Sequence, residues 1–242
     1  GSPTGLLTGW YNAIFPRLCR TKAGPYNRNI LCLEDFVRLY RGIGTALAGV
    51  IALAFAATTA PAQQAIDPAA VLQERSIGSA DAPVTVVEYY SYTCPHCASF
   101  HNDVYGDLKK KYVDTGKVRF VYREFPLNGV DLRAGMMARC ADPRRFSGLV
   151  QVLFKNQTSW AQSSDPVSEL AKIGRLAGID DATFQSCIAN EELANGLLAE
   201  RQKASTQGVQ STPTFEIGGQ IYPGSRSIEE FSEIIDPLLA NN

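Results

Sequence analysis

The chain has 242 residues, and its 23 basic and 24 acidic side chains leave a net charge of −1 at neutral pH. This length allows one large domain or two small ones. The near balance of charge, without a basic patch after the first sixty residues, argues against nucleic acid as the partner.

The first sixty or so residues differ in composition from the rest of the chain. Up to residue 62 there are six Lys or Arg against two acidic residues, and the stretch Ile43–Ala57 is apolar or small. Ala60-Pro61-Ala62 then supplies an A-x-A cleavage pattern. We therefore expect residues 1–62 to be a leader, with a cleaved secretory signal peptide at about 37–62. An uncleaved membrane anchor is the alternative, although the apolar run is short for a bilayer.

The part of the leader before residue 37 is too long for the basic start of a signal peptide. The chain also has no methionine before Met136. We hypothesise that translation begins near Val37 at a non-AUG codon, so that residues 1–36 are mis-assigned upstream sequence. A peptide from Gly1–Arg28 in the expressed protein would contradict this.

Residues 63–242 show alternating strand and helix patterns, which predict an α/β domain. After a short lead-in, the apolar run Val84–Tyr90 predicts a strand buried on both faces. Apolar residues then recur in steps of four at Phe100, Val104, Leu108 and Tyr112, which predicts one helix ending near Gly116. A second strand is expected at 117–124.

A long helical tract follows, between two strand predictions. Asp142-Pro143 and Asp165-Pro166 each place a capping residue before a proline at the first helical position. Helices are expected at 131–141, from 143, 166–178, 181–189 and 191–207. A hairpin at 214–222 with a glycine turn and a capped helix at 228–239 complete the chain.

The motif Cys94-Pro95-His96-Cys97 falls where the first strand turns into a helix. Pro95 suits the first helical position, where no amide hydrogen is needed. The free amides and dipole of a helix N-terminus favour a thiolate over a thiol. The sequence therefore predicts thiol chemistry here. Cys94 is the expected nucleophile because it lies nearest the helix terminus, and Cys97 is the expected resolving partner.

Other uses of this motif were weighed. A c-type haem would need histidine directly after the second cysteine, where the chain has Ala98. Zinc could recruit Cys94, Cys97 and His101, but a fourth ligand with suitable spacing is missing from the sequence. A plain structural disulfide is also possible in principle, although Pro and His between the cysteines fit redox use better.

The stretch Glu88–Cys97 resembles the active-site region of DsbA-type thiol–disulfide oxidoreductases, and Ser211–Phe215 looks like the cis-proline loop of thioredoxin-fold enzymes. The resemblance implies an α/β thioredoxin fold over residues 63–242, with an all-helical domain inserted at about 128–208. The long separation of Glu124 from Pro213 also favours an insertion, since a parallel strand pair needs only one crossover helix.

The resemblance and the chemistry of the residues together assign further roles. His96 is expected to stabilise the Cys94 thiolate. Glu88 is either a buried acid that shuttles a proton to Cys97, as the resemblance implies, or a strand-end acid paired with a surface lysine. Pro213 is expected to be cis beside the disulfide, and the backbone of Thr212 to pair with an extended substrate. Threonine departs from the valine of the best-known DsbA proteins at this position.

After the leader the chain keeps four cysteines, an even number that suggests two disulfides in an exported protein. Spacing does not fix their connectivity. The resemblance to a DsbA subgroup with a second disulfide implies a structural bond between Cys140 and Cys187. Two buried free thiols are the alternative.

These observations predict a monomeric periplasmic oxidase without a bound cofactor, whose redox centre is the Cys94–Cys97 disulfide. The resemblance implies unfolded or nascent exported proteins as substrates and a DsbB-like membrane protein as the reoxidant. A disulfide isomerase or reductase of the same fold is the alternative, motivated by Thr212. A non-enzymatic metal- or peptide-binding module is a more remote one.

Overall fold

A computed structural model of the chain describes residues 66–240. The leader expected over residues 1–62 lies outside the described residues. None of the helices between residues 66 and 240 combines the length and hydrophobicity needed to cross a bilayer.

The core of the molecule is a five-stranded sheet with the strand order β1-β3-β2-β4-β5. Strands β2 and β3 are parallel, and the other neighbouring pairs are antiparallel. The strands are β1 Arg75–Ile77, β2 Val84–Tyr90, β3 Val118–Glu124, β4 Thr214–Ile217 and β5 Gln220–Pro223.

Strand β2 lies in the middle of the sheet, between β3 and β4. Val86, Glu88 and Tyr90 are all fully buried, as expected for a strand covered on both faces. Because β2 and β3 run parallel, the chain between them must cross over the sheet, and a helix is the usual way to do so. The next helix therefore begins at the end of β2.

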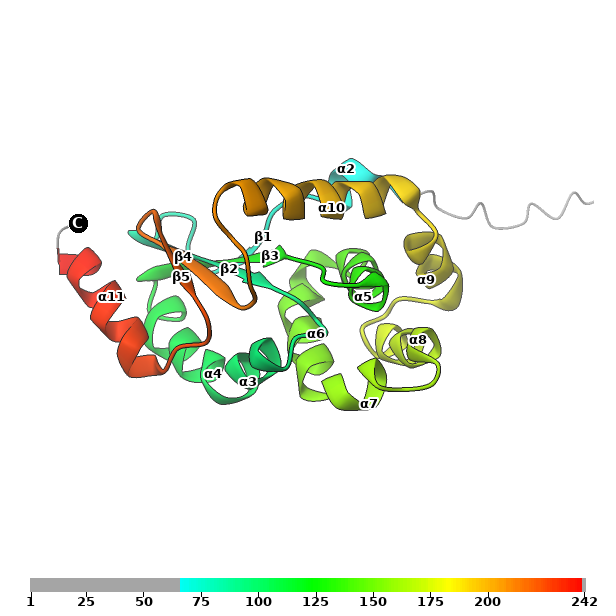
Figure 1. The fold of residues 1–242 in the computed structure, drawn as a ribbon, viewed down its shortest axis with the longest axis horizontal. Coiled ribbons are helices and arrows are strands. Elements are labelled where there is room, and N and C mark those ends of the chain that lie inside the picture. The colour runs from blue at the N-terminus through cyan, green and yellow to red at the C-terminus, as the bar shows by residue number, and fades with distance from the viewer. Residues whose placement is uncertain (1–65, 241–242) are drawn as a thin grey trace, which may run out of the picture. The chain divides into compact units, whose positions relative to one another are not determined.

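Helices cover both faces of the sheet (Figure 1). Helix α10 lies along one side, and helices α3, α4 and α11 lie along the other. On that second side Phe100 of α3 contacts Phe215 of β4 and Phe231 of α11, with ring centroids 4.8 and 5.7 Å away. The helices in this layer are α2 Pro68–Val71, α3 Pro95–Asp103, α4 Tyr105–Leu108, the π-helix η1 Lys109–Val113, α10 Glu191–Thr206 and α11 Ile228–Ala240.

The remaining helices are inserted between β3 and β4 and cluster beyond one end of the sheet (Figure 1). As predicted, Asp142 and Asp165 cap helices whose first residue is proline. The inserted helices are α5 Gly129–Arg139, α6 Pro143–Lys155, α7 Gln157–Ala161, α8 Pro166–Leu176 and α9 Asp181–Ile188, from which α10 returns to the sheet. The predicted α/β class with a helical insertion is confirmed.

The single helix predicted after the active-site motif is wrong, because the chain breaks it at Val104 into α3, α4 and η1. The backbone of Val104 has φ −121° and ψ −41°, away from helical values. After this break Tyr105 is buried and its hydroxyl lies 2.5 Å from that of Tyr122 on β3. The register change therefore brings Tyr105 into the core, which a regular helix with Val104 on its apolar face would not do.

The sequence also failed to reveal β1, which lies within the expected lead-in. This strand has only three residues and pairs antiparallel with β3, from Arg75 opposite Tyr122 to Ile77 opposite Phe120. A strand this short carries no readable alternation, so its pairing depends on the free edge of β3.

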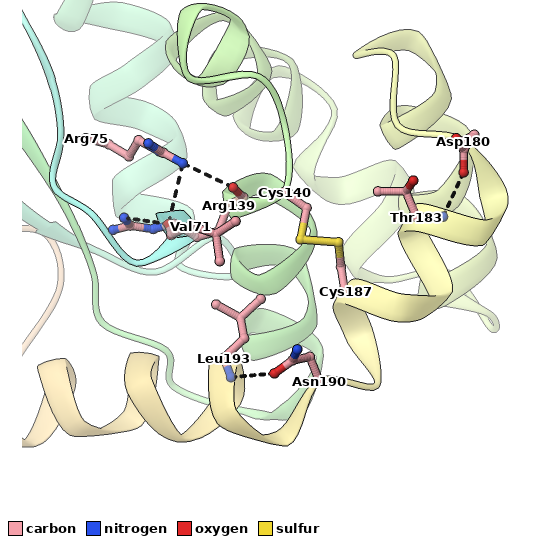
Figure 2. Close-up of a disulfide and its surroundings, with 9 residues drawn as sticks. All are labelled: Val71, Arg75, Arg139, Cys140, Asp180, Thr183, Cys187, Asn190 and Leu193. Atoms are coloured by element: carbon pink, nitrogen blue, oxygen red, sulfur yellow. Dashed lines mark hydrogen bonds between the residues drawn. A yellow bond between two sulfur atoms is a disulfide. The ribbon is translucent and has the colours of Figure 1, made fainter. Parts of the chain in front are cut away.

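A disulfide joins Cys140, at the end of α5, to Cys187 of α9 (Figure 2). Next to it, the buried Arg139 donates to the Glu124 carboxylate with Nε 2.7 Å from Oε1. The Arg139 carbonyl accepts from Arg75, as Figure 2 also shows. The end of α5 is thus tied to α9, to the end of β3 and to the segment before the sheet.

We predict that replacing Cys140 and Cys187 together with alanine lowers the free energy of unfolding by about 4 kcal/mol, because the bond closes a long loop in the unfolded chain. The two residues are 47 positions apart. Denaturant unfolding of oxidised wild type and variant measures the difference. Equal stability of the two proteins would contradict the prediction.

Candidate redox site

The two cysteines of the motif occupy different positions on α3. Cys94 is the N-cap residue, Pro95 is at the first helical position, and Cys97 lies inside the first turn. Cys94 is 7% exposed and Cys97 is fully buried. Both are free thiols in this structure. Attack from outside the protein therefore meets the Cys94 sulfur first.

Hydrogen-bond donors around Cys94 lower its pKa from an ordinary value of 9.0 to about 5. The largest contribution is a hydrogen bond from the Cys97 thiol, which outweighs the opposing effect of burial. The Thr212 hydroxyl and the backbone N–H groups of Cys97 and His96 add to it. The two backbone groups are free donors of the α3 N-terminus, where an anion is favoured.

The His96 side chain is exposed. Its contribution to the pKa of Cys94 comes from the backbone N–H. The stabilising role predicted for its imidazole stays a prediction.

The loop before β4 lies against Cys94. The Thr212–Pro213 peptide bond is cis, and the Thr212 carbonyl oxygen lies 3.2 Å from the Cys94 sulfur, which donates to it as a thiol. The Thr212 hydroxyl is buried and, among the described residues, has no partner while Cys94 is a thiol. Facing a thiolate, the same hydroxyl can donate, which explains how it lowers the pKa of Cys94.

The second cysteine has the opposite character. Burial, first of all, raises the pKa of Cys97 far above its ordinary value, and the hydrogen bond to Cys94 and the negative charge of Glu88 raise it further. Glu88 lies in the middle of β2, opposite Tyr122 on one side and Phe215 on the other. A thiol that resists ionisation therefore lies within the electrostatic reach of a buried carboxylate.

Glu88 pairs with a buried histidine, so the alternative of a surface lysine is wrong. The His101 Nε2 lies 2.9 Å from Glu88 Oε2 and 3.2 Å from Oε1, and both side chains are fully enclosed. The other ring nitrogen, Nδ1, lies 2.7 Å from the amide nitrogen of Gln151 on α6. Both ring nitrogens are thus engaged, which argues against His101 as a zinc ligand beside Cys94 and Cys97.

A buried aspartate of the insertion holds the turn that precedes Cys94. Asp131 of α5 accepts hydrogen bonds from the Ser91 hydroxyl, the Tyr92 N–H and the Leu127 N–H at 2.5–2.8 Å. Burial raises the pKa of Asp131 to about 6, and the charge of Cys94 acts in the same direction. Asp131 therefore responds to the charge on the nucleophile while it fixes the turn.

Two amides of the insertion complete this support. The buried Gln157 of α7 donates its Nε2 to the carbonyls of Tyr92 and Cys94 at 2.8 and 2.9 Å. Asn128, the N-cap of α5, donates to the Thr93 hydroxyl. The backbone on either side of Thr93 is thus held by side chains from α5 and α7.

The structure brings together every predicted site residue except the Cys140–Cys187 pair, which lies in the insertion. Sequence reasoning missed the roles of Asp131, Gln151 and Gln157, and considered His101 only as a metal ligand. The one available signal was that His101 follows Cys97 by one helical turn. Between residues 66 and 240, no group of three His, Cys, Asp or Glu side chains is arranged to hold a metal.

Comparison with known proteins decides the family. A family described as Thioredoxin matches residues 71–237, more than half of the chain. This chain belongs to the thioredoxin family. A Rickettsia conorii protein named as a protein-disulfide oxidoreductase is 36% identical to this thioredoxin-family chain over 165 residues, 67% of the chain and 59% of the relative. The chain thus spans about three fifths of the length of that relative.

Solved structures place this thioredoxin-family chain close to DsbA-type proteins. The structure of Wolbachia pipientis alpha-DsbA1 is 27% identical, covers 70% of this chain and 92% of its own, and gives a TM-score of 0.65. A protein-disulfide isomerase from Novosphingobium aromaticivorans is 28% identical, covers 68% of this chain and 97% of its own, and gives a TM-score of 0.59. The predicted resemblance to the DsbA type is confirmed.

We predict that the Cys97 side chain sets the acidity of Cys94. Replacing Cys97 with alanine should raise the pKa of Cys94 above about 5, because the largest stabilising donor is lost. Replacing Cys97 with serine should keep it closer to the wild-type value, because a hydroxyl also donates. Thiolate absorbance against pH measures both. Identical values for the two variants would contradict the prediction.

We also predict that reduction stabilises the protein at neutral pH. The folded pKa of Cys94 lies below its unfolded value, so the thiolate contribution is fully present above about pH 9 and is lost as pH falls through about 5. The Cys94–Cys97 disulfide offsets little because its loop is very short. Melting temperatures of both redox forms between about pH 4 and pH 8 should show the reduced form gaining as pH rises. A constant difference would contradict this.

Proposed function

We propose that this protein is a periplasmic thiol:disulfide oxidoreductase that donates its Cys94–Cys97 disulfide to newly exported proteins. The observation that carries the proposal is the contrast between the two sulfurs. Cys94 has a pKa lowered to about 5, whereas burial raises the pKa of Cys97. A stabilised Cys94 thiolate favours the reduced form, and this makes the disulfide a better oxidant; the handling of DsbA as an oxidant rests on the same principle.

The reaction begins when a substrate thiolate attacks the Cys94 sulfur. The Cys94–Cys97 bond breaks, its electron pair goes to the Cys97 sulfur, and that sulfur takes up a proton from Glu88. A second substrate thiolate then attacks the substrate sulfur of the mixed disulfide, and Cys94 leaves as a thiolate. The substrate loses two electrons and the cysteine pair gains them.

The cis-proline loop supports a substrate site that reads backbone. Thr212 is half-buried and directly precedes cis-Pro213 beside Cys94. An extended peptide can add to such an edge through main-chain hydrogen bonds, with little demand on side chains. This suits an enzyme that acts, as a monomer, on many unfolded chains.

The compartment and the reoxidant belong to the same proposal. The apolar stretch and A-x-A pattern of the leader support export through a cleaved signal peptide. In an oxidising periplasm, a DsbB-like membrane protein would restore the disulfide and pass the two electrons to quinone.

A disulfide isomerase or reductase is a second candidate, favoured by threonine before the cis-proline. The likeness to the Novosphingobium protein-disulfide isomerase points the same way. The redox potential of the Cys94–Cys97 pair separates the candidates, because an oxidase needs a potential near that of DsbA, about −120 mV, and a reductase one near thioredoxin, about −270 mV.

We predict that the oxidised protein forms disulfides in a reduced, unfolded model substrate. Cys94→Ser should abolish this, because the accessible sulfur is lost. Cys97→Ser should instead trap a mixed disulfide with thiol-activated substrate, because Cys94 remains and its resolving partner is gone. Thiol counting on the substrate and non-reducing electrophoresis measure the outcomes. Cys140→Ala with Cys187→Ala is the matched control and should stay active. An inactive wild type would sink the proposed function.

A further inference from the structure

The proton that Cys97 exchanges must come from a group inside the protein, since Cys97 is fully buried. Glu88 is near enough for its charge to raise the pKa of Cys97. The ease with which Glu88 releases a proton and takes it back therefore depends on what holds its carboxylate. The group that holds it is the buried imidazole of His101.

The state of that imidazole depends on α6 of the insertion. The Gln151 Nε2 is 2.7 Å from His101 Nδ1, and an amide nitrogen can only donate. Nδ1 must then be an acceptor, so a neutral ring carries its hydrogen on Nε2, which points at Glu88. The ring is further fixed by stacking on Phe154 of α6, with centroids 4.2 Å apart and planes at 16°.

We propose that Gln151 and His101 are positioning residues that tune the proton exchange between Glu88 and Cys97: Gln151 selects the Nε2–H tautomer of His101, which stabilises the Glu88 carboxylate. The inference rests on the proposed function and deepens it. When the disulfide opens, the proton moves from Glu88 to the Cys97 sulfur, and the resulting carboxylate accepts from His101 Nε2–H. When Cys97 becomes oxidised again, its proton returns to Glu88. No proton leaves the buried site.

The surroundings leave this chain in control of the carboxylate. The other titratable side chains that face Glu88 or His101 come from β2, β3, α3 and α4, namely Tyr90, Tyr122, Cys97 and Tyr105. Burial raises the pKa of Tyr105 to about 12 and raises those of Tyr90 and Tyr122 well above the ordinary value. These phenols stay neutral where the enzyme works. Among the described residues, the cationic partner that Glu88 can have is His101.

Two substitutions of Gln151 should act in opposite directions. Gln151→Leu removes the donor to Nδ1, so the ring can move its hydrogen there and accept from a protonated Glu88. Gln151→Glu places an acceptor at Nδ1, so the ring can carry both hydrogens and face Glu88 as a cation. The first change favours the protonated Glu88 and the second the carboxylate. The near cation outweighs the more distant new anion.

The test combines magnetic resonance with kinetics on the whole protein. Nitrogen-15 shifts of the wild type report which ring nitrogen of His101 carries hydrogen, and we expect Nε2. Carbon-13 titration of the Glu88 carboxyl, assigned with Glu88→Gln, should move up in Gln151→Leu and down in Gln151→Glu. We expect each shift to be about one pH unit, the size of one charge-assisted hydrogen bond. The pH profile for reduction of the disulfide by dithiothreitol should move likewise.

Ser147→Ala, one turn earlier on α6, is the matched control and should leave the carboxyl titration and the pH profile unchanged. An Nδ1–H tautomer in the wild type, no movement of the Glu88 titration, or movement in the same direction in both variants would overturn the inference. If Gln151→Leu does not fold, the wild-type tautomer and Gln151→Glu still decide it. A wild type that fails to oxidise substrate dithiols sinks the proposed function instead, and the resonance measurements distinguish that result.

Discussion

The hydrogen bonds that gather around the Cys94 sulfur depend on where α3 begins. Because β2 and β3 are parallel, α3 must start at the end of a strand buried in the middle of the sheet. The unpaired N–H groups of its first turn therefore converge on the N-cap residue, which is Cys94. Sheet pairing, helix start and thiol acidity are consequences of one chain direction.

The three residues between the start of the motif and Cys97 are enough to reverse the chemistry of the second thiol. Cys94 lies at the rim, where backbone donors and the cis-proline loop meet it. Cys97 lies one turn inward, against the apolar core and the charge of Glu88. Each thiol also affects the other, since the hydrogen bond between them lowers the pKa of Cys94 and raises that of Cys97. The asymmetry between nucleophile and resolving thiol follows from depth of burial along one helical turn.

The helical insertion forms part of the site. Asp131 and Gln157 hold the turn before Cys94, and Gln151 engages the histidine that pairs with Glu88. The disulfide between Cys140 and Cys187 ties α5, which carries Asp131, to α9. A change of stability in the insertion therefore reaches the nucleophile through the elements that position it.

The sequence alone determined the parts of this protein that depend on neighbours along the chain. A proline after Cys94, the capping residues Asp142 and Asp165, and the glycine turn at 218–219 each act through φ preferences or hydrogen bonds within a few residues. Those signals placed the strand, the active-site helix start and most of the inserted helices. The resemblance added the pairing of Cys140 with Cys187.

Only the tertiary structure decided which side chains meet at the site. Asp131 meets Tyr92 across 39 positions, Gln151 meets His101 across 50, and Cys94 meets Thr212 across 118. The break at Val104 likewise serves a contact with the sheet that no local pattern specifies. A buried polar group must find a hydrogen-bond partner, but the partner can come from any element that packs against it. The sequence therefore specified where the thiol chemistry lies, and the packing of distant elements specified what tunes it.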